Sequence, residues 1–234
     1  MSEIAMVDAA FGSRLNGPQR QAATYGFDSG GGCGPLLVIA GAGTGKTNTL
    51  AHRVAFLLTQ RVAPERIALM TFSRRAAQEM LRRAERIAAE ALSGTSLAGV
   101  VGASTRQLWS GTFHAIGNRL LREYAPSLGL SDNFSVLDRG DSADLMDMAR
   151  HDLGFAQLAK RFPRKETCLS IYSLRVNTQA SLLETLDKSY PSFVDWHDEL
   201  NTLFRSYVDA KQAHQLLDYD DLLLYWHLLM QEPV

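Results

Sequence analysis

Residues 36–47 are Leu-Leu-Val-Ile-Ala-Gly-Ala-Gly-Thr-Gly-Lys-Thr, an apolar run followed by a glycine-rich loop that ends in Lys46 and Thr47. The apolar run 36–40 is short and bounded by glycine, which is the pattern of a strand buried on both faces of a parallel sheet. Apolar residues then recur at helical spacing, which predicts a helix from about residue 47 to 60. A strand, a glycine loop and a helix in this order predict a phosphate-binding loop.

The residue types in this loop suit a nucleotide triphosphate. Gly41, Gly43 and Gly45 let the main chain approach the phosphates closely, so that its N–H groups can point at them. Lys46 supplies a positive charge and Thr47 a hydroxyl group for Mg²⁺, at the N-terminus of a helix whose dipole favours anions. We therefore expect a nucleoside triphosphate and Mg²⁺ as cofactors, Lys46 and Thr47 as the catalytic candidates and Thr47 as the metal ligand. The expected nucleotide site comprises Ala40, Gly41, Ala42, Gly43, Thr44, Gly45, Lys46 and Thr47.

The chain outside the loop divides into two regions of different character. A second apolar strand is predicted at 67–72, followed by a helix capped by Ser73 that continues to about residue 91. A loop at 93–110, a short strand near 108–110 and a helix over 113–124 complete an α/β region with a parallel sheet. Beyond Pro126, a brief extended piece at 134–137 precedes a mostly helical region. Its predicted helices span about 141–153, 166–177, 193–215 and 219–230.

Composition and charge limit the classes of protein. Hydrophobic residues make up 46% of the 234 residues and charged residues 21%, which is ordinary for a globular protein. Residues 1–125 hold 14 Lys or Arg against 8 Asp or Glu, a net of +6, whereas residues 126–234 hold 10 against 17, a net of −7. A basic first half favours contact with a polyanion, although chance clustering on exposed helices is the alternative.

The first twelve residues lack the pattern of a secretory signal, and no apolar run is long enough to span a membrane. Cys33 and Cys168 show neither disulfide-framework nor zinc-site spacing. We therefore expect a cytoplasmic protein with no membrane partner.

Four further segments carry candidate residues. Gln19 lies upstream of the loop, and an amide can donate to and accept from the edge of adenine, although a surface glutamine is the plainer interpretation. Phe72, Ser73 and Arg74 follow the second strand, where a ring could stack on a base. Thr112, Phe113 and His114 again join a strand to a helix. The acidic cluster at 218–221 follows a predicted helix that extends to Leu217, so we expect helix capping there and not a metal site.

Taken in order, these segments resemble the N-terminal part of UvrD/Rep-like superfamily-1 DNA helicases. The resemblance rests on LNGPQRQAA (15–23), GPLLVIAGAGTGKT (34–47), LMTFSRRAAQEM (69–80), GTFHAIGNRLLR (111–122), FSVLDRGD (134–141) and LLDYDDLLL (216–224). It implies an ATP-binding RecA-like domain over 1–123, a helical insertion over 124–212 and a return to the RecA-like domain over 213–234.

The resemblance also implies roles for individual residues. Gln19 would recognise adenine, and residues 41–47 would hold ATP and Mg²⁺. The implied partners are single-stranded DNA, or its junction with a duplex, and the remaining domains of a helicase that moves 3′ to 5′. The strand path would be lined by Phe72, Ser73, Arg74, Thr112, Phe113 and His114.

The sequence departs from the family pattern in two ways. Asn48 stands where many relatives carry Arg, and no apolar strand is followed by a DExQD-type motif. The arginine fingers of a second motor domain are also absent, so we expect part of a longer helicase that hydrolyses ATP negligibly by itself. A helicase–nuclease subunit of the AddA or RecB type, a small-molecule P-loop kinase and a non-enzymatic binding module remain as alternatives.

Overall fold

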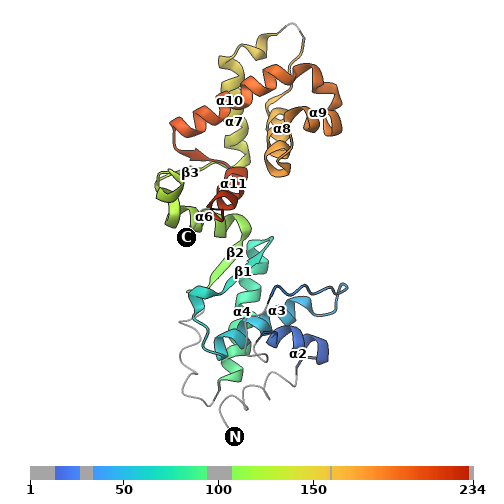
Figure 1. Cartoon of the computed structure of the whole chain (residues 1–234), viewed down its shortest axis with the longest axis vertical. Helices are drawn as coiled ribbons and strands as arrows, with labels where there is room; N and C mark the ends of the chain where they lie inside the picture. Colours follow the sequence, from blue (N-terminus) through green and yellow to red (C-terminus); the bar gives the residue numbers. More distant parts are fainter. Residues whose placement is uncertain (1–13, 27–33, 94–106, 159, 232–234) are drawn as a thin grey trace. The chain divides into compact units, whose positions relative to one another are not determined.

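The computed structural model describes residues 14–26, 34–93, 107–158 and 160–231 (Figure 1). The chain forms two compact units, residues 1–116 and 117–234. The helix α6 (Phe113–Tyr124) spans the boundary between them in sequence. The first unit combines helices with parallel strands and the second is mostly helical, which confirms the predicted fold class.

The first unit contains α2 (Gly17–Thr24), α3 (Lys46–Thr59), η1 (Pro64–Arg66), β1 (Ala68–Thr71), α4 (Arg74–Ala91) and β2 (Trp109–Thr112). The strands β1 and β2 are parallel, with Thr71 opposite Thr112 at their carboxyl ends. Ser73 begins α4 as predicted, because its hydroxyl oxygen accepts from the N–H of Ala76 at 3.1 Å. Buried side chains of α3, β1 and α4 share one core, which includes Val54, Phe56, Leu69, Met80 and Ile87.

The predicted strand over residues 36–40 is wrong. These residues have no regular structure, and the side chains of Leu37 and Ile39 are 82% and 88% exposed. A strand that is buried on both faces needs a paired neighbour. Within the described part of the chain, β1 and β2 pair with each other and no strand pairs with this segment. The apolar run therefore lies on the surface as irregular chain that leads into the glycine loop.

The second unit is built mainly from α7 (Arg139–Asp152), α8 (Lys165–Thr178), α9 (Leu182–Ser189), α10 (His197–Ala213) and α11 (Tyr219–Leu229). Short 3₁₀ segments lie between them: η3 (Ala125–Leu128), η4 (Phe155–Gln157) and η5 (Pro191–Trp196). The first four helices bury a common core that includes Met146, Ile171, Leu186, Leu200 and Phe204. Burial of each such side chain contributes about 1.5–3 kcal/mol. The helices predicted for this region are thereby confirmed, with ends shifted by a few residues.

The end of α10 differs from the sequence prediction. The helix was expected to continue to Leu217, but it ends at Ala213, and Gln215 adopts a left-handed conformation with φ 54°. The next residues form β4 (Leu216–Leu217), which pairs in parallel with β3 (Ser135–Val136). Pairing with a strand 81 residues earlier is a long-range contact, so helical periodicity in the local sequence did not reveal it.

Two sets of sequence predictions are not tested by the structure. Most of the glycine-rich lead-in 29–35 and of the loop 93–110 lies outside the described residues. The domain limits 1–123, 124–212 and 213–234 come from the family resemblance and stay predictions. Within the described ranges, every helix is too short or too polar to cross a bilayer.

Candidate functional site

The glycine loop combines two left-handed glycines with the start of a helix. A turn at residues 42–44 leads directly into α3, which begins at Lys46. Gly43 and Gly45 have φ of 76° and 84°, in the left-handed region that glycine adopts without strain. The first N–H groups of a helix have no partner within it. The loop therefore presents unpaired donors and a helix N-terminus to solvent, as an anion site would.

Lys46 folds back over this loop. Its Nζ donates to the carbonyl oxygens of Ala40 at 2.8 Å and Gly41 at 2.6 Å. The Thr44 hydroxyl also donates to the Gly41 carbonyl at 2.8 Å, which tightens the turn. Lys46 and Thr47 are both exposed, so a ligand in solution could reach the ammonium and the hydroxyl group. These neutral acceptors can be exchanged for phosphate oxygens without disturbing the core.

Gln19 contacts the phosphate loop directly. Its Nε2 donates to the Thr44 carbonyl at 3.0 Å, while its Oε1 accepts from the N–H of Asn16 at 3.1 Å. The second bond belongs to a capping box that begins α2. The same Nε2 lies 2.9 Å from where a Cβ on Gly45 would stand. The structure thus brings Gln19 to the loop, and recognition of adenine by this side chain stays a prediction.

A cavity of about 390 Å³ adjoins the loop. Its wall includes Lys46, Tyr25 and Arg53, and the Arg53 guanidinium donates to the Ala23 carbonyl at 3.0 Å. We did not single out Tyr25 or Arg53 from the sequence. The available signal was spacing, because Arg53 lies two helical turns after Lys46 and therefore on the same face of α3. An aromatic ring and a guanidinium beside a phosphate loop suit a planar base.

The residues predicted to contact DNA gather at the carboxyl ends of β1 and β2. The parallel register places Phe72 beside Phe113, with ring centroids 5.5 Å apart. Phe72 is 94% exposed, whereas Phe113 is half-buried. Arg74 is exposed in the first turn of α4. The structure therefore presents an aromatic pair with a cation nearby, which suits stacking on bases of a single strand.

The other three of these residues have structural contacts at the same edge. Ser73 caps α4, and the Thr112 hydroxyl oxygen accepts from the N–H of Ala115 at 3.2 Å at the start of α6. His114 is half-buried and already has an interaction partner. Their positions fit the predicted path, but their contacts with DNA stay predictions.

The acidic cluster at 218–221 behaves as we predicted. Asp218 begins α11 in a capping box with Asp221, and Asp220 accepts from the side-chain amide of Asn177 at 2.8 Å. Asp218 and Asp221 also pair with Lys211, a partner that the sequence did not reveal. Among the described residues, no group of histidine, cysteine and carboxylate side chains is arranged to hold a metal ion.

Comparison with known proteins shows similarity to helicases. The UvrD/REP helicase N-terminal domain matches residues 15–233. The ATP-dependent DNA helicase PcrA of Staphylococcus epidermidis is 31% identical over 193 residues, which cover 82% of this chain and 24% of the relative. PcrA of Leuconostoc citreum is 31% identical over 192 residues, covering 82% and 23%. The chain thus spans about a quarter of the length of these relatives. It belongs to the UvrD/REP helicase family, as an N-terminal domain.

Proposed function

We propose that this chain is the nucleotide- and DNA-binding N-terminal part of an ATP-dependent DNA helicase. The observation that supports the proposal is the glycine loop, whose two left-handed glycines and helix N-terminus would form an anion site beside Lys46. The names of the PcrA relatives supply the reaction class. The first unit would bind ATP and the single strand, and further domains of a longer protein would complete the motor.

The residues of the loop fit ATP and Mg²⁺. The N–H groups of residues 41–46 would surround the phosphates, and Lys46 would leave the carbonyls of Ala40 and Gly41 to reach them. The Thr47 hydroxyl would hold Mg²⁺. The base would occupy the neighbouring cavity against Tyr25. Binding of nucleotide neutralises phosphate charge here, which is the first requirement for phosphoryl transfer.

The aromatic pair Phe72 and Phe113 would stack on successive bases, with Arg74 near a phosphate. As the DNA substrate we propose a single strand, or its junction with a duplex. By family resemblance, the direction of movement is 3′ to 5′. We place this activity in the cytoplasm.

We further propose that the 234-residue chain alone hydrolyses ATP negligibly. The sequence contains no DExQD-type motif after an apolar strand. That motif would supply the residues that position water, and positioning is most of the catalytic effect in phosphoryl transfer. A P-loop kinase is the rival, and it would turn over ATP with a small acceptor and ignore DNA.

The central test is nucleotide binding by the purified chain and its Lys46→Met variant. Charge-assisted hydrogen bonds contribute about 1.5–3 kcal/mol, so we expect affinity for a fluorescent ATP analogue to fall about 10- to 150-fold. The matched control is Lys188→Met, an exposed lysine in α9 whose loss should change nothing. Equal affinity of wild type and Lys46→Met would refute the site, and ATP turnover without DNA would favour the kinase.

A further inference from the structure

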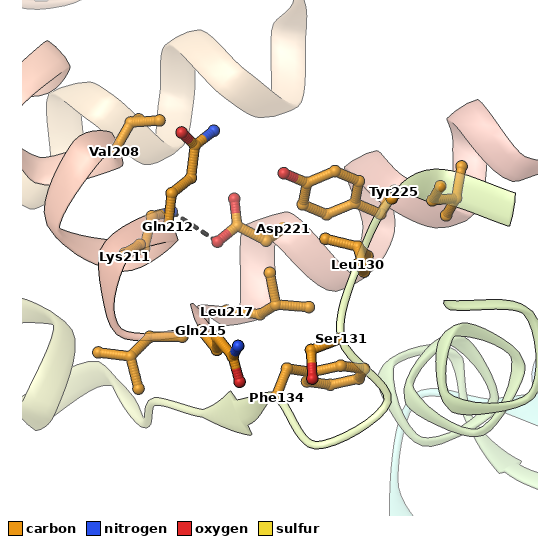
Figure 2. A pocket seen from close by; sticks show the side chains of 13 residues that line it. Leu130, Ser131, Phe134, Val208, Lys211, Gln212, Gln215, Leu217, Asp221 and Tyr225 are labelled. Atoms are coloured by element: carbon orange, nitrogen blue, oxygen red, sulfur yellow. Dashed lines mark hydrogen bonds and ion pairs between the residues drawn. The ribbon is translucent and has the colours of Figure 1, made fainter. Parts of the chain in front are cut away.

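The second unit contains a cavity of about 430 Å³ that the proposed helicase function does not use. It lies where β4 and the ends of α10 and α11 meet the segment 128–134 (Figure 2). Leu130, Phe134 and Leu217 form apolar parts of the wall. Gln212 and Tyr225 add polar groups. Small-molecule sites typically enclose about 300–1,000 Å³, so the cavity is large enough for a compact ligand.

A buried cluster that includes two residues of the cavity wall, Lys211 and Asp221, carries an unbalanced negative charge. Lys211, Asp218 and Asp221 are only 3%, 3% and 6% exposed. The Lys211 ammonium lies 2.7 Å from Asp218 Oδ2 and 2.5 Å from Asp221 Oδ2. The hydroxyl groups of Tyr172 and Tyr207 join the network by hydrogen bonds but add no charge. One ammonium and two carboxylates leave a net charge of −1 where water hardly reaches, and such a charge is costly unless it is paired.

The two oxygens of the Asp221 carboxylate differ in their contacts. Oδ2 accepts from Lys211 and from the N–H of Asp218 at 2.9 Å, whereas Oδ1 accepts no hydrogen bond from any described residue. Figure 2 shows this carboxylate between Gln212 and Tyr225, with one oxygen toward Lys211 and the other turned away from it. Asp221, which lines the cavity, thus has one carboxylate oxygen, Oδ1, that accepts no hydrogen bond from a described residue.

We propose that this cavity binds an organic cation, an ammonium or guanidinium group on a short apolar arm, with its charge paired to Asp221 Oδ1. The amide oxygens of Gln212 and Gln215 would accept its remaining N–H groups, and the arm would lie against Leu130 and Phe134. Binding would bring the buried charge to zero. A free amine and a Lys or Arg side chain of another polypeptide share this chemistry.

The titration of Asp221 gives the site a pH dependence. Burial raises the pKa of Asp221 to about 6, Lys211 opposes the rise and Asp218 adds to it. The Lys211 pKa is lowered by burial, but Asp221 and Asp218 outweigh this effect and raise it. Burial raises the pKa of Tyr172 to about 12, and burial also raises that of Tyr207 and Tyr225. Near pH 6, therefore, Asp221 changes charge, whereas Lys211 and the three tyrosines keep theirs.

The experiment titrates n-butylammonium and n-butylguanidinium into the full 234-residue chain at pH 7.5, followed by ¹H–¹⁵N NMR. We expect saturable amide shifts confined to the residues of the wall, with affinity falling at least tenfold at pH 5. Asp221→Asn should also weaken binding at least tenfold. Asp220→Asn is the matched control, because it removes a neighbouring carboxylate in the same helical turn, and it should bind like wild type.

A second variant distinguishes loss of binding from loss of the fold. Gln212 is exposed, so Gln212→Lys should leave the circular dichroism spectrum unchanged while its ammonium occupies the site and abolishes binding. Two outcomes would overturn the proposal: neutral 1-pentanol binding as tightly as n-butylammonium, or Asp221→Asn binding like wild type. The peptide Gly-Arg-Gly separates the two sources. If the peptide binds more tightly than n-butylguanidinium, the natural ligand is a polypeptide side chain. If the peptide binds more weakly, the natural ligand is a free amine.

Discussion

Replacing Phe72 by alanine tests the DNA contact more cleanly than any other substitution in this chain. The side chain is 94% exposed and, among the described residues, its ring contacts that of Phe113, so its removal should lower the free energy of unfolding by less than about 1 kcal/mol. Stacking contributes about 1–3 kcal/mol per base, which predicts a 5- to 150-fold loss of single-strand affinity. Fluorescence anisotropy with a labelled oligothymidylate measures this loss, and Phe72→Trp should retain affinity.

The salt dependence of binding separates stacking from charge. Phe72→Ala removes no charge, so the slope of log affinity against log salt should stay the same. Arg74→Ala should reduce that slope by about 0.7, the value for one phosphate contact on a single strand. Met148→Ala is the control, because it removes an apolar side chain that is 62% exposed in the second unit. Unchanged affinity of Phe72→Ala, with an intact fold, would refute the stacking role.

Three further predictions concern stability. Gly45→Ala places a side chain on a residue with left-handed backbone and sets its Cβ 2.9 Å from Gln19 Nε2. The free energy of unfolding, measured in urea, should therefore fall by at least about 1–2 kcal/mol. Gly17→Ala is the control, because its Cβ would meet nothing within 4 Å, and it should leave the free energy of unfolding unchanged. Lys211→Met leaves two buried carboxylates without their cation and should cost about 3–5 kcal/mol, measured in the same way. Because the folded pKa of Asp221 is raised from 3.8 to about 6, the folded state binds more protons between these pH values, and this group lowers stability by about 2 kcal/mol as pH rises from 4 to 6. Unfolding curves of wild type against Asp221→Asn should diverge by this amount, and parallel curves would contradict it.

Features that depend on local sequence could be predicted. Ser73 begins α4, and Asp218 begins α11, because a capping side chain and its helix are neighbours in sequence. The sequence placed Gly41, Gly43 and Gly45 in one tight loop, and the structure gives Gly43 and Gly45 the left-handed conformation that glycine adopts freely.

Features that depend on distant partners could not be predicted. The run 36–40 has the composition of a buried strand but has no paired neighbour among the described residues, and β4 forms only because β3 lies beside it. Lys211 gave no signal of its burial, since nothing local shows that the end of α10 meets Asp218 and Asp221. The cavity residues Tyr25 and Arg53 likewise come together only once α2 packs on α3.

The hydrogen bond from Gln19 to the Thr44 carbonyl joins two segments 25 residues apart. Any ligand that draws this amide away must also release the turn next to Gly45, so the base end and the phosphate end of a nucleotide would influence each other. The binding free energies of adenosine and of inorganic triphosphate would then not sum to that of ATP. The change in this difference between wild type and Gln19→Ala would measure how strongly this side chain couples the two halves of the ligand.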